Sequence, residues 1–249
     1  RPLAQLLGGD RPFYGLQARG LMGEDRPHDD FTEAARDYIA EMRQGQPQGP
    51  YLLGGFSGGG LIAWEIARQL EAAGEEVPLV VLLDTPIPLR PELSRADKTL
   101  IKLALLGEKG PGYLLEWAGA RAEWKRQQGL PQAASQDAAF HNAEIEAAFR
   151  AALPRYAMAP RAGGTVLFRP PLDRHWRVSG GAWVSSAKEY VFADNDLTRF
   201  APALQVEEVP GDHDSMVLEP NVRVLAARMK QVIEQAEAAP LAPLAQAAE

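Results

Sequence analysis

The chain has 249 residues, a length that is ordinary for one α/β domain. Of these residues 46% are hydrophobic and 24% charged, a composition typical of folded globular proteins rather than of a disordered chain. Its net charge is −7 with no basic run, so we expect no nucleic-acid surface, and its longest apolar run, Leu79–Leu83, is too short to cross a membrane. The lack of cysteine excludes disulfides, cysteine zinc sites and a cysteine nucleophile, and it favours a cytoplasmic location.

Apolar runs alternate with helical patterns in the first third of the chain, which is typical of a parallel α/β sheet. Gly74 should end the helix expected at 61–73, because glycine readily adopts the left-handed backbone conformation that often follows a helix. The run Leu79–Leu83 is typical of a strand that is buried on both faces. The expected elements are, in chain order, a strand at 12–17, a helix from Asp29 or Asp30 to Arg43, a strand at 51–55, a helix at 61–73 and a strand at 79–83.

The alternation then stops, and residues 96–156 are helical in their period. This insertion is longer than a connection needs, so residues 87–157 predict a lid over the carboxyl ends of the strands; the alternative is a helical subdomain that only adds core. Its apolar residues should form the core of the lid rather than contact substrate: Leu103, Leu106, Leu114, Leu115 and Trp117. The remaining elements expected of a domain spanning 1–237 are strands at 164–168 and 204–209, a helix at 221–237 and then a mobile Ala/Pro-rich tail at 238–249.

The strongest chemical signal is Gly55-Phe56-Ser57-Gly58-Gly59, which matches the G-x-S-x-G nucleophile elbow of α/β-hydrolases. The motif lies between an apolar strand and a helix, where the elbow requires it, and its glycines should relieve crowding around a strained serine. The helix that starts near Gly58 would direct free N–H groups toward an oxyanion beside Ser57. The alternatives are a glycine-rich turn with an incidental serine, or a phosphate-binding loop, which the absence of a following lysine disfavours.

A nucleophilic serine needs a base, and the chain has four histidines. His213 follows the last predicted strand and precedes the last helix, where a side chain can lean over the strand ends. We expect His28 and His141 at the surface and His175 in a polar loop. Metal binding by residues 212–214 is the rival interpretation, but no second histidine or spaced cluster of ligands supports it.

Two aspartates could orient the histidine. Asp84 ends the strand that follows the nucleophile helix, and Asp173 follows the next strand. Both give the order Ser, Asp, His that this fold uses, so spacing alone leaves the acid open.

Four segments together resemble the thioesterase domain that ends nonribosomal peptide synthetases and modular polyketide synthases. The resemblance covers about residues 1–236, with the helical insertion as the variable lid. The segments are Arg11–Leu21 for the early strand, Tyr51–Ala67 for the nucleophile, Leu82–Thr85 for the acid and Val209–His213 for the histidine. It implies an α/β-hydrolase fold with a mostly parallel sheet and a helical lid, a catalytic Ser57 and His213, and Gly58 as an oxyanion donor.

The resemblance also bears on the acid and on the N-terminus. In carrier-linked members the acid follows the strand after the nucleophile helix, which implies Asp84, whereas free-standing editing enzymes more often use the position of Asp173. The family has an earlier strand and a glycine-containing loop that supplies a second oxyanion donor. Because this sequence opens at Arg1-Pro2-Leu3, we expect that strand and loop to be missing, either by truncation or by loss of half the oxyanion hole.

The function that the resemblance implies is chain termination. Ser57 would take an acyl or peptidyl chain from a phosphopantetheinyl carrier protein and release it by hydrolysis or macrocyclisation. The phosphopantetheine belongs to the carrier, so no cofactor of the domain's own is expected. The alternatives are a free-standing editing thioesterase or another serine esterase and, from a different class, a catalytically silent carrier-docking module.

Overall fold

A computed structural model describes residues 2–8, 11–23, 25–110 and 142–238, together with Gly112 and Gly119. The chain separates into two compact units. The first unit comprises Arg1–Arg90, Phe140–Pro171 and Ala193–Glu249, and the second comprises Pro91–Ala139 and Leu172–Phe192. In the described part of the chain, no helix is both long enough and apolar enough to cross a membrane.

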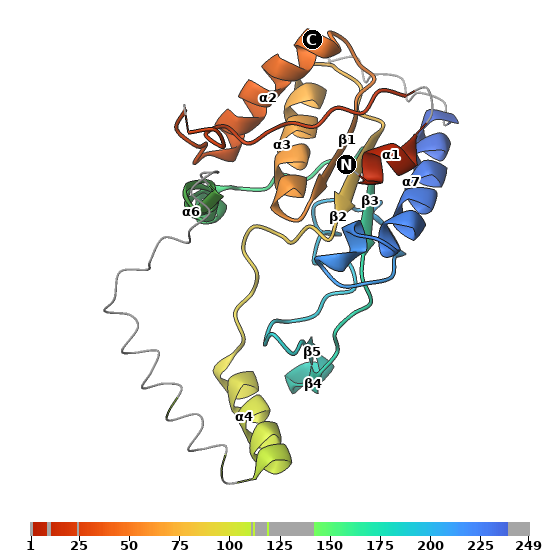
Figure 1. Ribbon diagram of the computed structural model, residues 1–249. Helices are drawn as coiled ribbons and strands as arrows, with labels where there is room; N and C mark the ends of the chain where they lie inside the picture. The colour runs from red at the N-terminus through yellow and green to blue at the C-terminus, as the bar shows by residue number, and fades with distance from the viewer. Residues whose placement is uncertain are drawn as a thin grey trace, which may run out of the picture. The chain divides into compact units, whose positions relative to one another are not determined.

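A four-stranded parallel sheet forms the centre of the first unit (Figure 1). Its strands, in spatial order, are β1 (Leu52–Phe56), β2 (Leu79–Leu83), β3 (Gly164–Arg169) and β6 (Gln205–Glu208). These confirm four of the five predicted strands to within one or two residues. Phe56 pairs with Leu83, and Leu83 pairs with Phe168, so the carboxyl ends of three strands lie side by side.

Helices cover both faces of this sheet, with α2 (Phe31–Gly45) and α3 (Gly58–Ala72) on one side and α1 (Pro2–Leu7) and α7 (Asn221–Ala238) on the other (Figure 1). The side chains of β2 alternate between two apolar clusters. Val80 and Leu82 pack in the α2–α3 cluster, whereas Leu79, Val81 and Leu83 pack in the α7 cluster. The uninterrupted apolar run of this strand is therefore explained by burial on both faces.

The ends of α2 and α3 confirm the sequence signals. Asp30 caps α2, because its carboxylate accepts hydrogen bonds from the N–H groups of Thr32 at 2.8 Å and Glu33 at 2.9 Å. This contact decides between the two aspartates that the sequence offered. Gly74 follows α3 with a φ of +81°, the left-handed conformation expected after a helix.

The predicted strand at 12–17 is wrong. Residues 11–17 are exposed and pair with no other described strand. Phe13 and Tyr14 keep more than half of their surfaces exposed, so this segment lacks the buried face that holds a strand in a sheet. Instead, Arg11 anchors the segment to the end of α7 through an ion pair with Glu237.

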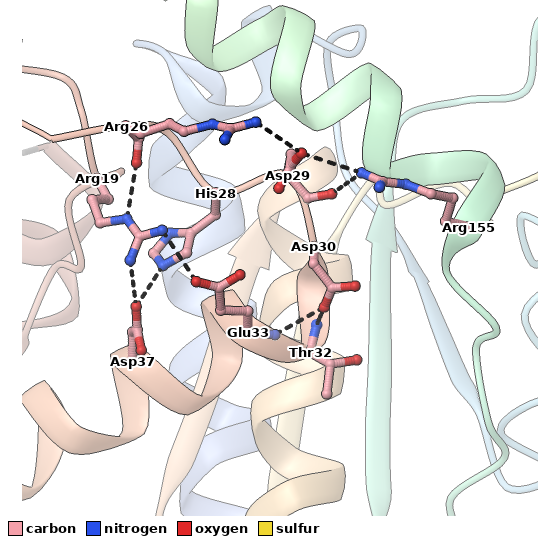
Figure 2. Close-up of polar contacts among 9 residues, drawn as sticks. All are labelled: Arg19, Arg26, His28, Asp29, Asp30, Thr32, Glu33, Asp37 and Arg155. Carbon is pink, nitrogen blue, oxygen red and sulfur yellow. Dashed lines mark hydrogen bonds and ion pairs between the residues drawn. The ribbon is translucent and has the colours of Figure 1, made fainter.

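His28 is not the surface residue that the sequence suggested, since only 8% of its side chain is exposed. Its Nε2 bonds to Asp37 at 2.8 Å, and Arg19 reaches the same carboxylate oxygen at 2.7 Å (Figure 2). The hydrogen bond with His28 lowers the pKa of Asp37 below its usual value. On the other side of the loop, Arg155 donates to the carbonyl oxygen of Asp29. This network fastens the segment before α2 to two elements of the first unit.

The predicted lid interval, 87–157, contributes to both units. Helix α4 (Arg95–Lys109) belongs to the second unit, whereas α6 (Asn142–Ala152) and a 3-10 turn (Leu153–Arg155) belong to the first. Of the predicted apolar lid residues, Leu103 is exposed and Leu106 is half-buried. Leu114, Leu115, Trp117, His141 and residues 239–249 lie outside the described residues.

The second unit also holds an antiparallel pair, β4 (Trp176–Arg177) with β5 (Trp183–Val184), joined through a 3-10 turn (Ser179–Gly181). Asp97 of α4 ties the helix to this pair. Its carboxylate accepts hydrogen bonds from Ser179 and from the Tyr190 hydroxyl, and these bonds depress the pKa of Asp97 strongly.

Candidate active site

Ser57 lies at the junction of β1 and α3. Its φ of +52° and ψ of −125° form a sharp bend in a backbone conformation that residues other than glycine rarely adopt. The Ser57 N–H donates to the carbonyl oxygen of Leu83 at 2.8 Å, which continues the pairing of β1 with β2 past Phe56. The bend therefore starts from a fixed backbone position at the carboxyl edge of the sheet.

The glycines around Ser57 have unequal steric roles. A Cβ on Gly55 would lie 2.2 Å from the carbonyl oxygen of Gly59, so the first motif glycine is required by a backbone-to-backbone approach. A Cβ on Gly59 would meet nothing within 4 Å, so the second motif glycine does not relieve the crowding expected from the sequence. A Cβ on Gly58 would lie 2.4 Å from the ring of Phe149, and one on Gly60 would lie 1.9 Å from Thr85 Oγ1.

We expect Gly55→Ala to destabilise the protein by at least about 1–3 kcal/mol, because overpacking against backbone cannot be relieved by a rotamer change. Gly59→Ala is the matched control. It adds the same methyl group at the second residue of α3 and should be neutral or stabilising, by up to about 1 kcal/mol. Urea denaturation followed by circular dichroism gives both free energies of unfolding. Equal destabilisation by the two substitutions would contradict this account of the elbow.

The loop after β6 holds His213. Gly211, with a φ of +105°, turns the chain, and a Cβ there would lie 2.7 Å from Asn221 Nδ2. Asp212 accepts from the Ser215 N–H at 2.8 Å and from its hydroxyl, which lowers the pKa of Asp212. The imidazole of His213 stacks on the Phe56 ring, with 4.9 Å between the ring centroids. The turn and the stacked ring together orient the histidine over the end of β1.

The structure brings three of the predicted residues together. His213 Nε2 lies 3.1 Å from Ser57 Oγ, and His213 Nδ1 lies 2.7 Å from Asp84 Oδ2. Asp84 follows β2 with a φ of +44°, and its N–H donates to the carbonyl oxygen of Phe168 at 2.7 Å. The Asp84 side chain is 18% exposed and that of His213 is 45% exposed. A serine, an imidazole and a carboxylate in this order can move a proton from the hydroxyl to the imidazole and hold the resulting cation.

The competing candidates make other contacts. Asp173 accepts hydrogen bonds from the N–H and hydroxyl of Ser186 within the second unit, and these bonds lower its pKa. His175 lies edge-on to Trp176 in the same unit. Asp212, the first residue of the rival metal-binding interpretation, accepts hydrogen bonds from the N–H and hydroxyl of Ser215. Among the residues that the structure describes, no group of three or more acidic or histidine side chains could hold a metal ion.

Two residues near the site were not predicted. The ring of Phe149, from α6, lies against Gly58 and packs 4.9 Å from the ring of Phe31. Asn195 Nδ2 donates to Asp84 Oδ1 at 3.0 Å and to the carbonyl oxygen of Thr85 at 3.2 Å. The sequence carries no motif for either contact, because both partners come from segments far along the chain.

A parallel sheet covered on both faces, with a serine at the bend between a strand and a helix, defines the α/β-hydrolase fold. Comparison with solved structures agrees. A thioesterase from the prodiginine biosynthetic pathway in Streptomyces coelicolor matches with a TM-score of 0.57 at 18% identity, over 93% of this chain and 83% of that one. A four-domain nonribosomal peptide synthetase matches with a TM-score of 0.55 at 28% identity, over 90% of this chain and 17% of that one.

The sequence model of the thioesterase domain family matches residues 1–239, and the chain belongs to this family. Among curated relatives, chondramide synthase cmdD of Chondromyces crocatus is 30% identical over 94% of this chain. Malpinin synthetase of Mortierella alpina is 48% identical over 35% of this chain. The chain spans only 6% of the length of the first relative and 1% of the second.

Proposed function

We propose that this domain is a chain-releasing thioesterase of the serine-hydrolase type, and that it acts on an acyl or peptidyl chain carried by a phosphopantetheinyl carrier domain. The observation that carries the proposal is the continuous set of contacts from Ser57 Oγ through His213 to Asp84, in a chain of the thioesterase domain family. The curated relatives named above are a synthase and a synthetase, and one solved neighbour is a four-domain nonribosomal peptide synthetase, which supports a carrier domain as the partner.

The first half of the proposed reaction transfers the chain to the protein. His213 Nε2 takes the proton of Ser57 Oγ as this oxygen attacks the thioester carbonyl. Gly58 is the first residue of α3, and the first N–H groups of a helix lack acceptors within the helix, so its N–H would donate to the developing oxyanion. The C–S bond then breaks, and His213 returns the proton to the departing thiol, which stays on the carrier's phosphopantetheine.

The second half releases the chain. Water, or a hydroxyl or amine of the bound acyl or peptidyl chain, attacks the ester carbonyl on Ser57 while His213 removes the proton of this nucleophile. The C–O bond to Ser57 breaks, and the serine regains its hydrogen. Asp84 stabilises the imidazolium in both halves. Ser57 and His213 carry out every proton transfer on the protein side. The phosphopantetheine belongs to the carrier domain and holds the acyl chain that is the substrate.

The test compares one acyl group presented in two ways. A hexanoyl group is offered as a thioester on a phosphopantetheinylated carrier domain and as a p-nitrophenyl ester. We expect kcat/KM to be at least about 10-fold higher for the carrier-bound chain, because binding of the carrier contributes to transition-state stabilisation. A preference for the free ester would instead indicate a general esterase. Carrier binding without consumption of either substrate would indicate a docking module.

A further inference from the structure

Asp84 has a second hydrogen-bond partner besides His213. Its Oδ2 faces His213 Nδ1, and its Oδ1 accepts from Asn195 Nδ2 at 3.0 Å. The same amide nitrogen donates to the carbonyl oxygen of Thr85 at 3.2 Å. Because both of these partners are acceptors, only the NH₂ side of the amide can satisfy them, which settles the orientation of the Asn195 side chain.

Asn195 comes from a turn with its own supports. Asn195 and Asp196 both have left-handed backbones, with φ of +51° and +62°. The carboxylate of Asp194 accepts from the N–H of Asp196 at 3.0 Å and from that of Thr198 at 3.1 Å. Burial raises the pKa of Asp194, but these hydrogen bonds outweigh it, so its pKa lies below the usual value.

Neighbouring contacts attach this turn to the body of the first unit. Leu197 is fully buried in the α2–α3 cluster. Arg169, the last residue of β3, donates to the carbonyl oxygen of Ala193 at 2.7 Å. The turn is therefore anchored on both sides of Asn195. The fixed backbone of the turn directs the Asn195 side-chain amide toward Asp84.

We infer that Asn195 is a positioning residue for Asp84, an inference that rests on the proposed function. Asp84 has a left-handed backbone at the end of β2, so its side-chain direction depends on local contacts. By donating to Oδ1 and to the Thr85 carbonyl, Asn195 fixes the carboxylate so that Oδ2 alone meets His213. The amide of Asn195 also stabilises the Asp84 carboxylate by donating a hydrogen bond, and an amide does not transfer its proton to a carboxylate.

Two substitutions separate this role from simple packing. Asn195→Ala removes the donor and should lower kcat/KM for the thioester by about 10- to 100-fold, the cost of one hydrogen bond to a charged group. Asn195→Asp keeps the shape but places a second carboxyl group beside Asp84, and it should lower kcat/KM as well, because the two acidic groups repel each other when ionised. The downfield NMR resonance of the His213 Nδ1 proton reports the hydrogen bond from His213 to Asp84, and this resonance should move upfield or disappear in Asn195→Ala.

Asp196→Asn is the matched control. It changes the next residue of the same turn, whose side chain pairs with Arg199 at 2.9 Å, and it should stay within about twofold of the unmodified protein. An unchanged His213 Nδ1 proton resonance, or a wild-type kcat/KM, in Asn195→Ala would overturn the inference. Recording this resonance needs no turnover. Its loss in Asn195→Ala, when the unmodified protein leaves the thioester intact, would therefore sink the proposed function and leave the positioning role standing.

Discussion

Replacement of Ser57 by alanine is expected to lower kcat for thioester cleavage by about 10⁴- to 10⁶-fold, the largest effect of any single substitution in this chain. The hydroxyl is the only group of the elbow that can form the covalent ester, and without it His213 has no proton to take from a nucleophile. The measurement is release of free carrier thiol under single-turnover conditions.

The control for this prediction addresses folding. Ser57 has a strained backbone, so the thermal unfolding midpoint of Ser57→Ala should be compared with that of the unmodified protein. Ser186→Ala, in the second unit, removes a serine hydroxyl that contacts Asp173 and should keep near-normal activity. A folded Ser57→Ala protein that retains a tenth or more of the wild-type rate would contradict Ser57 as the nucleophile.

Asp84→Asn is expected to lower kcat by about 10⁴-fold. The new amide can donate its NH₂ group to His213 Nδ1, so the proton of the neutral imidazole lies on Nε2. Nε2 faces Ser57 Oγ, and a protonated Nε2 cannot accept the hydroxyl proton. The NH₂ group of Asn195 would also donate to a neutral amide oxygen in place of the Asp84 carboxylate. Single-turnover acylation at neutral pH, measured beside the unmodified protein, gives the size of the loss.

Asp173→Asn is the matched control for the acid, because it makes the same chemical change at the other position that the sequence allowed. It should weaken the contact with Ser186 and leave the acylation rate within a few-fold of normal. If Asp173→Asn lost most of the activity while Asp84→Asn kept it, the acid of this site would have been assigned to the wrong strand.

Much of the scaffold follows from local sequence rules. The apolar run of β2 predicts a strand buried on both faces, and Asp30 and Gly74 mark the ends of helices. The strand-to-helix setting of Ser57 and the position of His213 after the last strand predict that both side chains reach one edge of the sheet. These features depend on residues that are close in sequence or on the general behaviour of parallel sheets.

The features that the sequence did not reveal depend on tertiary contacts. Helix α1 has six residues, too few for a period to show, and it is held by packing of Leu3 and Leu7 beside α7. Residues 12–17 have the composition of a strand but find no partner strand among the described residues. Asn195 reaches Asp84 from 111 positions away, through a left-handed turn that no local motif announces.

The intact mass of the domain after rapid mixing with a hexanoyl thioester, followed by peptide mapping, decides whether the reaction passes through an ester on Ser57. We expect an increase equal to one hexanoyl group, located on the peptide that contains Ser57 and absent from Ser57→Ala. Asp84→Asn should acquire the same mass much more slowly. An acyl group found on another residue, or one that still forms in Ser57→Ala, would show that Ser57 is not the nucleophile.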